Sequence, residues 1–231
     1  MDIEKLYKEL LQSDGVSTDS RKLRKNQLFF PLRGAHFNGN DFIPEALEQG
    51  CRLVVSDDPA WKDHRGVFYT GSVIETLQDL AAHHRRLSPA RVLAITGSNG
   101  KTTTKELIAR VLETTYTVHV TRGNLNNHIG VPLTLLELKK EQIAVIEMGA
   151  NHRKEIGLLC RIADPDMGLI TNIGKAHLEG FGSLEGVRIG KGELYDYLAE
   201  KARPAFIDIN DPVLAAMAGE RNLNTITYSV G

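Results

Sequence analysis

The sequence has few of the features that mark specialised classes of protein. Its 231 residues include two cysteines, Cys51 and Cys160, which lack the paired spacing of a disulfide or metal site. With 28 basic and 29 acidic residues the net charge is −1, so nothing favours nucleic acid or a membrane surface as a partner. No apolar run approaches the roughly 18 residues that span a bilayer. The charged N-terminus MDIEKLYKELLQ has no signal-peptide core. We therefore expect a cytoplasmic, monomeric protein with reduced thiols.

What the sequence does have is a regular alternation of helices and strands. In the first part, helices are predicted at 3–11, 41–49 and 72–87, and strands at 27–34, 51–56 and 66–71. From Arg91 onward, strands that are apolar throughout are predicted at 91–96, 116–120, 143–148, 167–173, 203–209 and 224–230. Helices are predicted between most of them, at 101–113, 131–138, 154–162, 184–199 and 212–218. Such alternation is typical of a parallel sheet covered on both faces. We expect an α/β protein with a small α/β domain at 1–87 and a doubly wound, mostly parallel domain at 88–231.

The segment GSNGKTTTK (97–105) follows the first strand of the second domain. Its two glycines are separated by two residues, whereas the full Walker pattern has four. Even so, the strand ends at Thr96, the glycines permit a tight turn, and a helix begins near Lys101. The free N–H groups and the dipole of that helix would face phosphates, with Lys101 against the terminal phosphates and the Thr102 hydroxyl on Mg²⁺. The alternative is a strand–turn–helix connection whose glycines only make the turn. The predicted nucleotide contacts are Thr96, Gly97, Ser98, Asn99, Gly100, Lys101, Thr102 and Thr103.

Two later strands also end in polar side chains. Glu147 ends the strand IAVIEM, and the strand MGLITNI leads into a glycine-rich loop that contains His177. Ligands of doubly wound sheets bind at the carboxyl ends of the strands, so the two side chains together favour a metal or phosphate site. Each one alone would be explained by an exposed glutamate or a packing histidine. By composition alone, Lys191 is a solvated helix lysine and Asn210 belongs to a helix cap.

Four motifs occur together in order and spacing. They are TGSNGKTTTKE, GNLNNHIGVPLTLL, EMGANHRKEI and TNIGKAHLEGFGSLEGVRIGKGEL. With the N-terminal STDSRKLRKNQLFFPLRGAHFNGNDFI, they resemble the Mur ligases of bacterial cell-wall synthesis. The resemblance implies a UDP-sugar-binding domain followed by a P-loop ATPase-like central domain. It also implies an activity: ATP phosphorylates the carboxylate of UDP-N-acetylmuramoyl-tripeptide (UDP-MurNAc-tripeptide), and the amine of D-Ala-D-Ala attacks the acyl phosphate. GNLNNHIGVP and GANHRKEI favour this activity over that of the amino-acid-adding sister ligases.

The resemblance also assigns roles to individual residues. It implies a catalytic set of Lys101, Glu147, His177 and Lys191, and a metal set of Thr102, Glu147, His177 and Lys191. In several members the lysine that matches Lys191 carries CO₂ as N6-carboxylysine, which overturns the reading of Lys191 as a solvated charge. Asn210 matches an adenine-side asparagine. The implied substrate contacts are Ser20, Arg21, Gly34, Asn38, Asn40, Asn126 and Asn127.

Two departures from the family pattern affect these expectations. Asn38 and Asn40 stand where many relatives have an aspartate and a histidine. The rest of the central domain and a third, Rossmann-like domain are not in this sequence. We therefore expect an N-terminal portion of a ligase that cannot complete ligation by itself. The alternatives are another Mur ligase, a binding protein for nucleotide or UDP-sugar without turnover, and a motor or switch NTPase. The shortened phosphate loop and the N-terminal module argue against the last.

Overall fold

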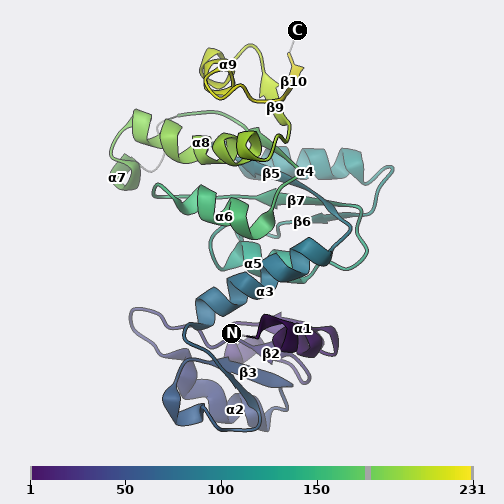
Figure 1. Ribbon diagram of the computed structural model, residues 1–231, viewed down its shortest axis with the longest axis vertical. Helices are drawn as coiled ribbons and strands as arrows, with labels where there is room; N and C mark the ends of the chain where they lie inside the picture. Colours follow the sequence, from purple (N-terminus) through teal and green to yellow (C-terminus); the bar gives the residue numbers. More distant parts are fainter. Residues whose placement is uncertain (1, 175–177, 230–231) are drawn as a thin grey trace. The chain divides into compact units, whose positions relative to one another are not determined.

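The structure, a computed structural model, describes residues 2–174 and 178–229 (Figure 1). It divides into two compact units, residues 1–84 and 85–231, where the sequence predicted a boundary after residue 87. Helix α3 (Val73–Leu87) runs through the point of division. All paired strands within each described sheet are parallel, which confirms the predicted α/β class.

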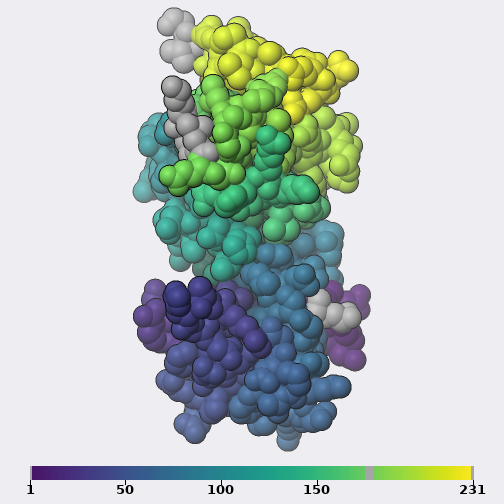
Figure 2. All heavy atoms as spheres, turned by 90° about the vertical axis from the view of Figure 1, so that its left-hand side faces the viewer, coloured from purple at the N-terminus to yellow at the C-terminus, as the bar shows by residue number. Residues whose placement is uncertain are grey.

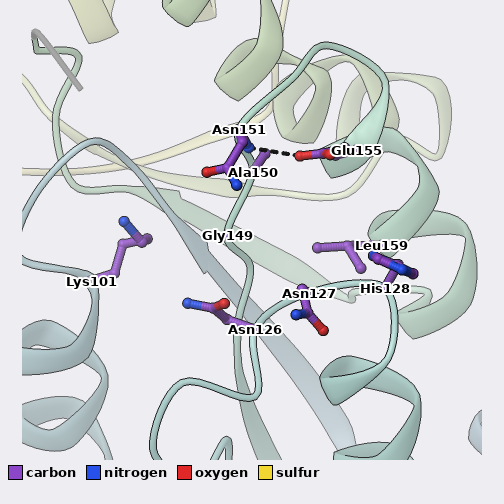
Figure 3. A pocket seen from close by; sticks show the side chains of 9 residues that line it. All are labelled: Lys101, Asn126, Asn127, His128, Gly149, Ala150, Asn151, Glu155 and Leu159. Carbon is purple, nitrogen blue, oxygen red and sulfur yellow. Dashed lines mark hydrogen bonds between the residues drawn. The ribbon is translucent and has the colours of Figure 1, made fainter. Parts of the chain in front are cut away.

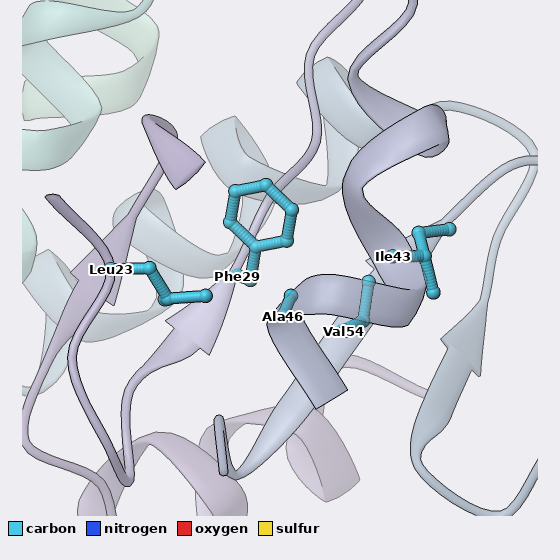
Figure 4. Packing of buried hydrophobic residues seen from close by; sticks show 5 residues of the cluster. All are labelled: Leu23, Phe29, Ile43, Ala46 and Val54. Carbon is cyan, nitrogen blue, oxygen red and sulfur yellow. The ribbon is translucent and has the colours of Figure 1, made fainter. Parts of the chain in front are cut away.

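The first unit has a four-stranded sheet in the order β1-β2-β3-β4. Its strands are β1 (Val16–Ser17), β2 (Leu28–Phe29), β3 (Leu53–Ser56) and β4 (Val67–Tyr69). Its helices are α1 (Ile3–Leu11), α2 (Ile43–Glu48) and the first part of α3, with 3-10 turns at Ser20–Lys22, Gly39–Phe42 and Pro59–Trp61. A cluster of buried apolar side chains fills the space between α2 and the sheet (Figure 4); it consists of Leu23, Phe29, Ile43, Ala46 and Val54. This packing gives the small unit a core of its own.

Strand β2 is shorter than the sequence predicted, because its pairing with the neighbouring strands ends at Phe29 instead of continuing to residue 34. Pro31 has no N–H to give to a neighbouring strand. Beyond it the chain folds back on itself, with Gly34 N donating to Phe37 O (3.0 Å) and Gly39 N donating to Leu32 O (3.1 Å). Of the predicted run 27–34, only Leu28 and Phe29 are therefore strand, and the rest is loop.

The second unit has a six-stranded sheet in the order β10-β9-β8-β5-β7-β6. Its strands are β5 (Arg91–Thr96), β6 (Val118–Val120), β7 (Ile143–Glu147), β8 (Met167–Ile170), β9 (Ala205–Asp208) and β10 (Thr225–Tyr228). Its further helices are α4 (Lys101–Leu112), α5 (Gly130–Leu136), α6 (Glu155–Ala163), α7 (Leu178–Phe181), α8 (Leu184–Glu200) and α9 (Pro212–Gly219). Every strand and long helix predicted for this region is present, with its ends shifted by a few residues.

Helices cover both faces of the second sheet. Leu93 and Ile95 of β5 pack with Val145 and Leu169 on the face that α4 covers through Ile108 and Leu112. On the other face, α6 packs against both α5 and α8, and α5 and α8 contact strands of the sheet (Figure 1). The atoms of β9, α9 and β10, in yellow in Figure 2, form one margin of this unit beside those of α8.

The strand order places the carboxyl end of β5 at a topological switch point. The chain leaves β5 for β6 and β7 on one side and later returns to β8 on the other side. In open α/β sheets the crevice at such a point is the usual ligand site. Thr96, Glu147 and Ile170 end the three central strands there. Among the residues that the structure describes, no helix is both long enough and apolar enough to cross a membrane.

Candidate functional site

The loop between β5 and α4 depends on two glycines with positive φ. Gly97 has φ 140° and Gly100, the N-cap of α4, has φ 78°, a left-handed conformation. A Cβ on Gly97 would lie 2.0 Å from Thr171 Oγ1, whereas one on Gly100 would meet nothing within 4 Å. Gly97 is therefore required for its conformation and for a close approach, and Gly100 for conformation alone. As predicted, the strand ends at Thr96 and the helix begins at Lys101.

The segment after β8 holds this loop in place. Thr171 Oγ1 donates to Asn99 O (2.7 Å), Asn99 N donates to Asn172 Oδ1 (3.1 Å), and Ser98 N donates to Asn172 O (3.1 Å). The Ser98 hydroxyl donates to Gly174 O (3.0 Å) and accepts from Gly174 N (2.9 Å). These bonds fix the loop before α4, whose first N–H groups have no partner within the helix.

Lys101 lies across the loop it follows. Its Nζ donates to Gly97 O (2.9 Å) and Ser98 O (3.3 Å). Burial lowers the pKa of Lys101, and the negative charge of Glu147 partly offsets that effect. The ammonium group and the N-terminus of α4 together make a strongly electropositive position, as a phosphate site needs.

Glu147 is the hydrogen-bonding centre of the site. Its side chain is 2% exposed, and its carboxylate accepts from Thr102 Oγ1 (2.9 Å) and from Asn126 Nδ2 (2.8 Å). Its backbone N–H donates to Thr121 Oγ1 (2.9 Å). A buried carboxylate is stable only when it is paired or hydrogen-bonded, and Thr102 and Asn126, from two neighbouring segments, supply these bonds. Glu147 and Thr102, predicted from separate motifs, lie in direct contact.

The Thr102–Glu147 pair fits a magnesium ion. In residues 2–174 and 178–229, no three His, Cys, Asp or Glu side chains gather as a metal site. Magnesium does not need such a cage, because it commonly takes one or two protein oxygens and completes its shell with phosphate oxygens and water. A P-loop threonine hydroxyl and an acidic side chain are the protein oxygens found in other phosphate-loop enzymes. His177, which was assigned to the same ion, lies outside the described residues.

A cavity of about 280 Å³ opens beside Lys101 (Figure 3). Figure 3 places Lys101 and Asn126 on one side of it and Glu155, His128 and Leu159 on the other. Gly149, Ala150, Asn151 and Asn127 complete the lining. The lining is polar and rich in amides, which suits a peptide more than an aromatic ring.

Asn126 and Asn127 were both predicted to contact the substrate. In the structure each one also makes hydrogen bonds that hold the site together. Asn126 holds the Glu147 carboxylate, and a Cβ on Gly149 would lie 2.8 Å from its Oδ1. Asn127 Oδ1 accepts from Ile129 N (3.0 Å) and Gly130 N (2.9 Å) at the start of α5. Both side chains also line the cavity.

Lys191 is buried in α8, 1% exposed, and is not a solvated surface lysine. Its Nζ donates to Ala150 O (3.2 Å) and lies 5.4 Å from the centroid of the Phe181 ring. Gly190 leaves room for that ring, because a Cβ there would lie 2.4 Å from it. Burial first, and the positive charge of Lys101 second, lower the pKa of Lys191 to about 8. Through Ala150, Lys191 touches the loop that lines the cavity.

The remaining predicted residues of the second unit lie close to the loop or at the same edge of the sheet. Thr96 is buried, and its hydroxyl donates to Met148 O (2.8 Å), which ties the ends of β5 and β7. Thr103 is exposed in the first turn of α4. Asn210 is exposed after β9, and its N–H donates to Asp208 Oδ1 (2.9 Å). The neighbouring Asp211 caps α9 by accepting from Val213 N (2.9 Å) and Leu214 N (3.1 Å).

In the first unit, Asn40 is a structural residue of the predicted UDP loop. It is buried, and its amide donates to Asp57 Oδ1 (3.0 Å) and accepts from Ser56 Oγ (3.0 Å). Asn38 caps the following 3-10 turn through Asn40 N (3.2 Å). Gly34 lies under the Phe37 ring, since a Cβ on Gly34 would lie 2.2 Å from it.

The other two predicted UDP contacts follow β1. Ser20 begins a 3-10 turn, and Arg21 is exposed and paired with Asp19 (2.9 Å). Of the predicted UDP contacts, Arg21 offers a cationic group at the surface.

Sequence reasoning missed several residues that build the site. Thr121 and Asn172 could have been found by the strand-end rule that identified Glu147, because each follows a strand of the sheet directly or within two residues. Lys105 could not: it is fully buried in α4, and its Nζ donates to Thr121 O (2.5 Å). Its role depends on a contact between α4 and the end of β6 that no local pattern encodes.

Comparison with known proteins agrees with the motifs. The family model of the Mur ligase middle domain matches residues 95–231, and that of the Mur ligase family catalytic domain matches residues 12–111. A UDP-N-acetylmuramoyl-tripeptide--D-alanyl-D-alanine ligase from Bacillus subtilis (strain 168) is 43% identical over 220 residues, which are 94% of this chain and 47% of the relative.

Solved structures show the same likeness. A crystal structure of MurF from Acinetobacter baumannii has a TM-score of 0.87 at 30% identity, covering 97% of this chain and 52% of that one. The MurF ligase from Thermotoga maritima in complex with ADP has a TM-score of 0.87 at 33% identity, covering 95% and 51%. The chain thus spans about half the length of these relatives. The resemblance predicted from the motifs is confirmed, and the chain belongs to the Mur ligase family.

Proposed function

We propose that the chain serves an ATP-dependent ligase that joins D-Ala-D-Ala to UDP-MurNAc-tripeptide through an acyl phosphate. The names of the relatives support these substrates, and the ADP complex of one of them supports the nucleotide. The observation that carries the proposal is the convergence of Lys101, Thr102 and Glu147 beside the cavity. A cytoplasmic location belongs to the same proposal, because ATP and nucleotide-linked precursors are cytoplasmic metabolites. A monomeric state is also part of the proposal.

The reaction needs two displacements. A carboxylate oxygen of the tripeptide attacks the γ-phosphorus of ATP, which forms the acyl phosphate and releases ADP. The amine of the dipeptide then attacks the acyl carbon and loses a proton. The phosphate leaves with the C–O bonding pair. A carboxylate is a poor electrophile, so the phosphate supplies the leaving group that amide formation requires.

The residues of this chain position and neutralise the reacting groups. Lys101 and the first N–H groups of α4 would bind the negative charge that spreads over the transferred phosphoryl group. Magnesium, held by Thr102 and Glu147, would supply further charge neutralisation. The hydrogen bonds of Asn126 and Thr121 to Glu147 hold the carboxylate and its strand end in one orientation. The cavity beside Lys101 would receive the peptide end of the precursor.

Lys191 would act as N6-carboxylysine. A neutral amine adds to CO₂ to give a carbamate anion and a proton, and burial with the nearby Lys101 favours the neutral amine. The product replaces repulsion between two cations with attraction between Lys101 and an anion. That anion would then orient magnesium or the groups bound to it.

The first unit would bind the UDP moiety through Ser20, Arg21 and the loop from Gly34 to Asn40. Asn40 would act from within by holding the loop to Ser56 and Asp57. Asn210 would lie on the adenine side of ATP, after β9 at the same edge of the sheet as the phosphate loop. His177 would join the metal and acyl-phosphate site.

The test has two parts. Calorimetry on this chain should detect UDP-MurNAc-tripeptide; no heat of binding at concentrations that saturate a known ligase would overturn the role of the first unit. A chain extended to the length of the relatives should release phosphate from ATP only when both precursor and D-Ala-D-Ala are present. Release that ignores the dipeptide would exclude the ligase, and dependence on a single amino acid would indicate an amino-acid-adding Mur ligase. Binding without any turnover in the extended chain would indicate a binding protein.

A further inference from the structure

Helix α6 begins without a capping side chain of its own. Its N-cap residue is Lys154, which has no side-chain acceptor and adopts a left-handed conformation with φ 73°. A helix start normally relies on Ser, Thr, Asp or Asn at this position to accept the N–H of the second or third helical residue. Without such an acceptor, the first N–H groups of the helix have no partner within the helix itself.

A carboxylate from another helix supplies both missing bonds. Glu193 of α8 accepts from Lys154 N through Oε1 and from Gly157 N through Oε2 (2.8 Å). In a capping box these two N–H groups are satisfied by two side chains within the same helix. Here one charged group from α8 does both, and it also meets the positive end of the α6 dipole.

Glu193 is two residues from Lys191, so α8 holds the same loop at two points. Lys191 Nζ donates to Ala150 O (3.2 Å) near the start of the loop, and Glu193 holds Lys154 at its end. Gly149, Ala150 and Asn151 of this loop line the cavity beside Lys101. Glu155 closes the turn from within, by accepting from Asn151 N (2.6 Å) and His152 N (3.1 Å).

We propose that Glu193 is a positioning residue that fixes the β7–α6 loop, and with it the cavity wall and the carbonyl partner of Lys191. It touches neither the cavity nor the phosphate loop, and so it acts through the loop 149–154. The inference rests on the proposed function only for the identity of the cavity's ligand. The phosphate loop is held by Thr171, Asn172 and Gly174 instead, so we expect nucleotide binding to depend on Glu193 far less than binding in the cavity does.

The test compares Glu193→Ala and Glu193→Gln with Glu200→Gln. Glu200 lies on the same helix but is 71% exposed and pairs with the adjacent Lys201, so it is a matched control. In Glu193→Ala, amides of residues 151–158 should exchange hydrogen roughly tenfold faster, as loss of a charged cap implies, while residues 97–102 keep their wild-type rates. Glu193→Gln keeps one acceptor and should show a smaller effect, and Glu200→Gln should show none.

Binding gives a second readout that a merely structural residue would not move. The dissociation constant for UDP-MurNAc-tripeptide should rise roughly tenfold in Glu193→Ala, and that for ATP less than about twofold. The substitution removes the equivalent of an acetate ion. Acetate, but not chloride at equal ionic strength, should therefore restore slow exchange.

Three results would overturn the proposal: unchanged exchange at 151–158, equal loss of both affinities, or no rescue by acetate. If the wild-type chain binds no UDP-MurNAc-tripeptide, the proposed function fails, while exchange and acetate rescue still decide the role of Glu193.

Discussion

Replacing Gly97 with alanine should damage the phosphate loop far more than replacing Gly100. Both glycines have positive φ, 140° and 78°, so each alanine would be strained. The surroundings differ: a Cβ at 97 would lie 2.0 Å from Thr171 Oγ1 and 3.0 Å from Thr171 N, and a Cβ at 100 has open space. Comparing Gly97→Ala with Gly100→Ala therefore separates the free-energy cost of the strained backbone from that of the steric clash.

The magnitudes follow from these two terms. Left-handed alanine costs about 1–2 kcal/mol, and the lost flexibility of the unfolded chain returns about 0.4–1 kcal/mol, so Gly100→Ala should destabilise by roughly 1 kcal/mol. Gly97→Ala adds a clash with a backbone N–H that cannot move cheaply, typically about 1–3 kcal/mol. It also breaks the bond from Thr171 to Asn99, worth about 1 kcal/mol. We expect roughly 3–5 kcal/mol in total.

Thermal unfolding and nucleotide titration measure the difference. At about 2–4 °C per kcal/mol for a unit of this size, Gly97→Ala should lower the Tm of the second unit by roughly 6–20 °C. Gly100→Ala should lower it by roughly 2–4 °C. ATP affinity should be lost in the first variant and weakened in the second, because the loop N–H groups move with Gly97.

A double variant tests the assigned cause. Thr171→Ala removes the hydroxyl oxygen that the new Cβ would strike, at the cost of the Asn99 bond. In that background Gly97→Ala should cost at least about 1 kcal/mol less than in the wild type, since neighbouring sites couple. Additive effects, or equal Tm losses for Gly97→Ala and Gly100→Ala, would refute the reasoning.

Three further substitutions test other parts of the structure. Thr102→Val removes the hydroxyl that donates to Glu147, and should weaken Mg-ATP binding roughly tenfold in calorimetry. Thr102→Ser keeps the hydroxyl and should stay near wild type. Equal affinity of the wild type and both variants would contradict the magnesium assignment. Burial tends to raise the pKa of Asp164, but the hydrogen bond from Arg203 helps to outweigh it and the pKa is lowered. The folded state therefore binds this proton less readily than the unfolded state, so the stability due to the carboxylate is present above about pH 4 and is lost as the pH falls below it. Chemical unfolding of Asp164→Asn should then show a stability deficit at pH 7 that narrows toward pH 3, and a constant deficit would contradict the shift. Asn40→Ala should destabilise the first unit by about 1–3 kcal/mol in thermal unfolding, because it leaves buried polar partners unsatisfied; an unchanged Tm would contradict its structural role.

The sequence predicted the second unit better than the first for a physical reason. Strands buried on both faces are apolar throughout, and their helices have clear starts, so strands such as β5 and β7 were found almost to the residue. The first unit has strands of two to four residues joined by 3-10 turns. In so small a sheet, an apolar run such as 27–34 can supply core side chains from a loop, and Pro31 was the signal against a long strand.

The candidate site divides in the same way. Glu147 and the phosphate loop could be predicted because a parallel sheet brings strand ends to one edge. The resemblance placed Thr102 and Glu147 at one metal ion, but the hydrogen bond from Asn126 to Glu147 could not be predicted, since it depends on how the β6–α5 connection packs. Lys191 shows the limit most clearly. Its local context is that of an exposed helix lysine, and only the fold buries it against Ala150.

Two helices at this edge of the sheet, α4 and α6, begin with the same unusual backbone conformation but differ in what their first N–H groups bind. Gly100 before α4 and Lys154 before α6 both have left-handed backbones, with φ 78° and 73°, and neither residue offers a side-chain acceptor to the first N–H groups of its helix. At α6 the acidic Glu193 takes those groups. At α4 the nearest buried acid, Glu147, is held by Thr102 and Asn126 and gives its bonds to side chains instead. The N-terminus of α4 thus has N–H groups that no acidic side chain of the described residues accepts, and it has a lysine beside them. Such a helix start is suited to bind an anion from solution. The contrast supports our proposal of a phosphate site at α4 and not at α6.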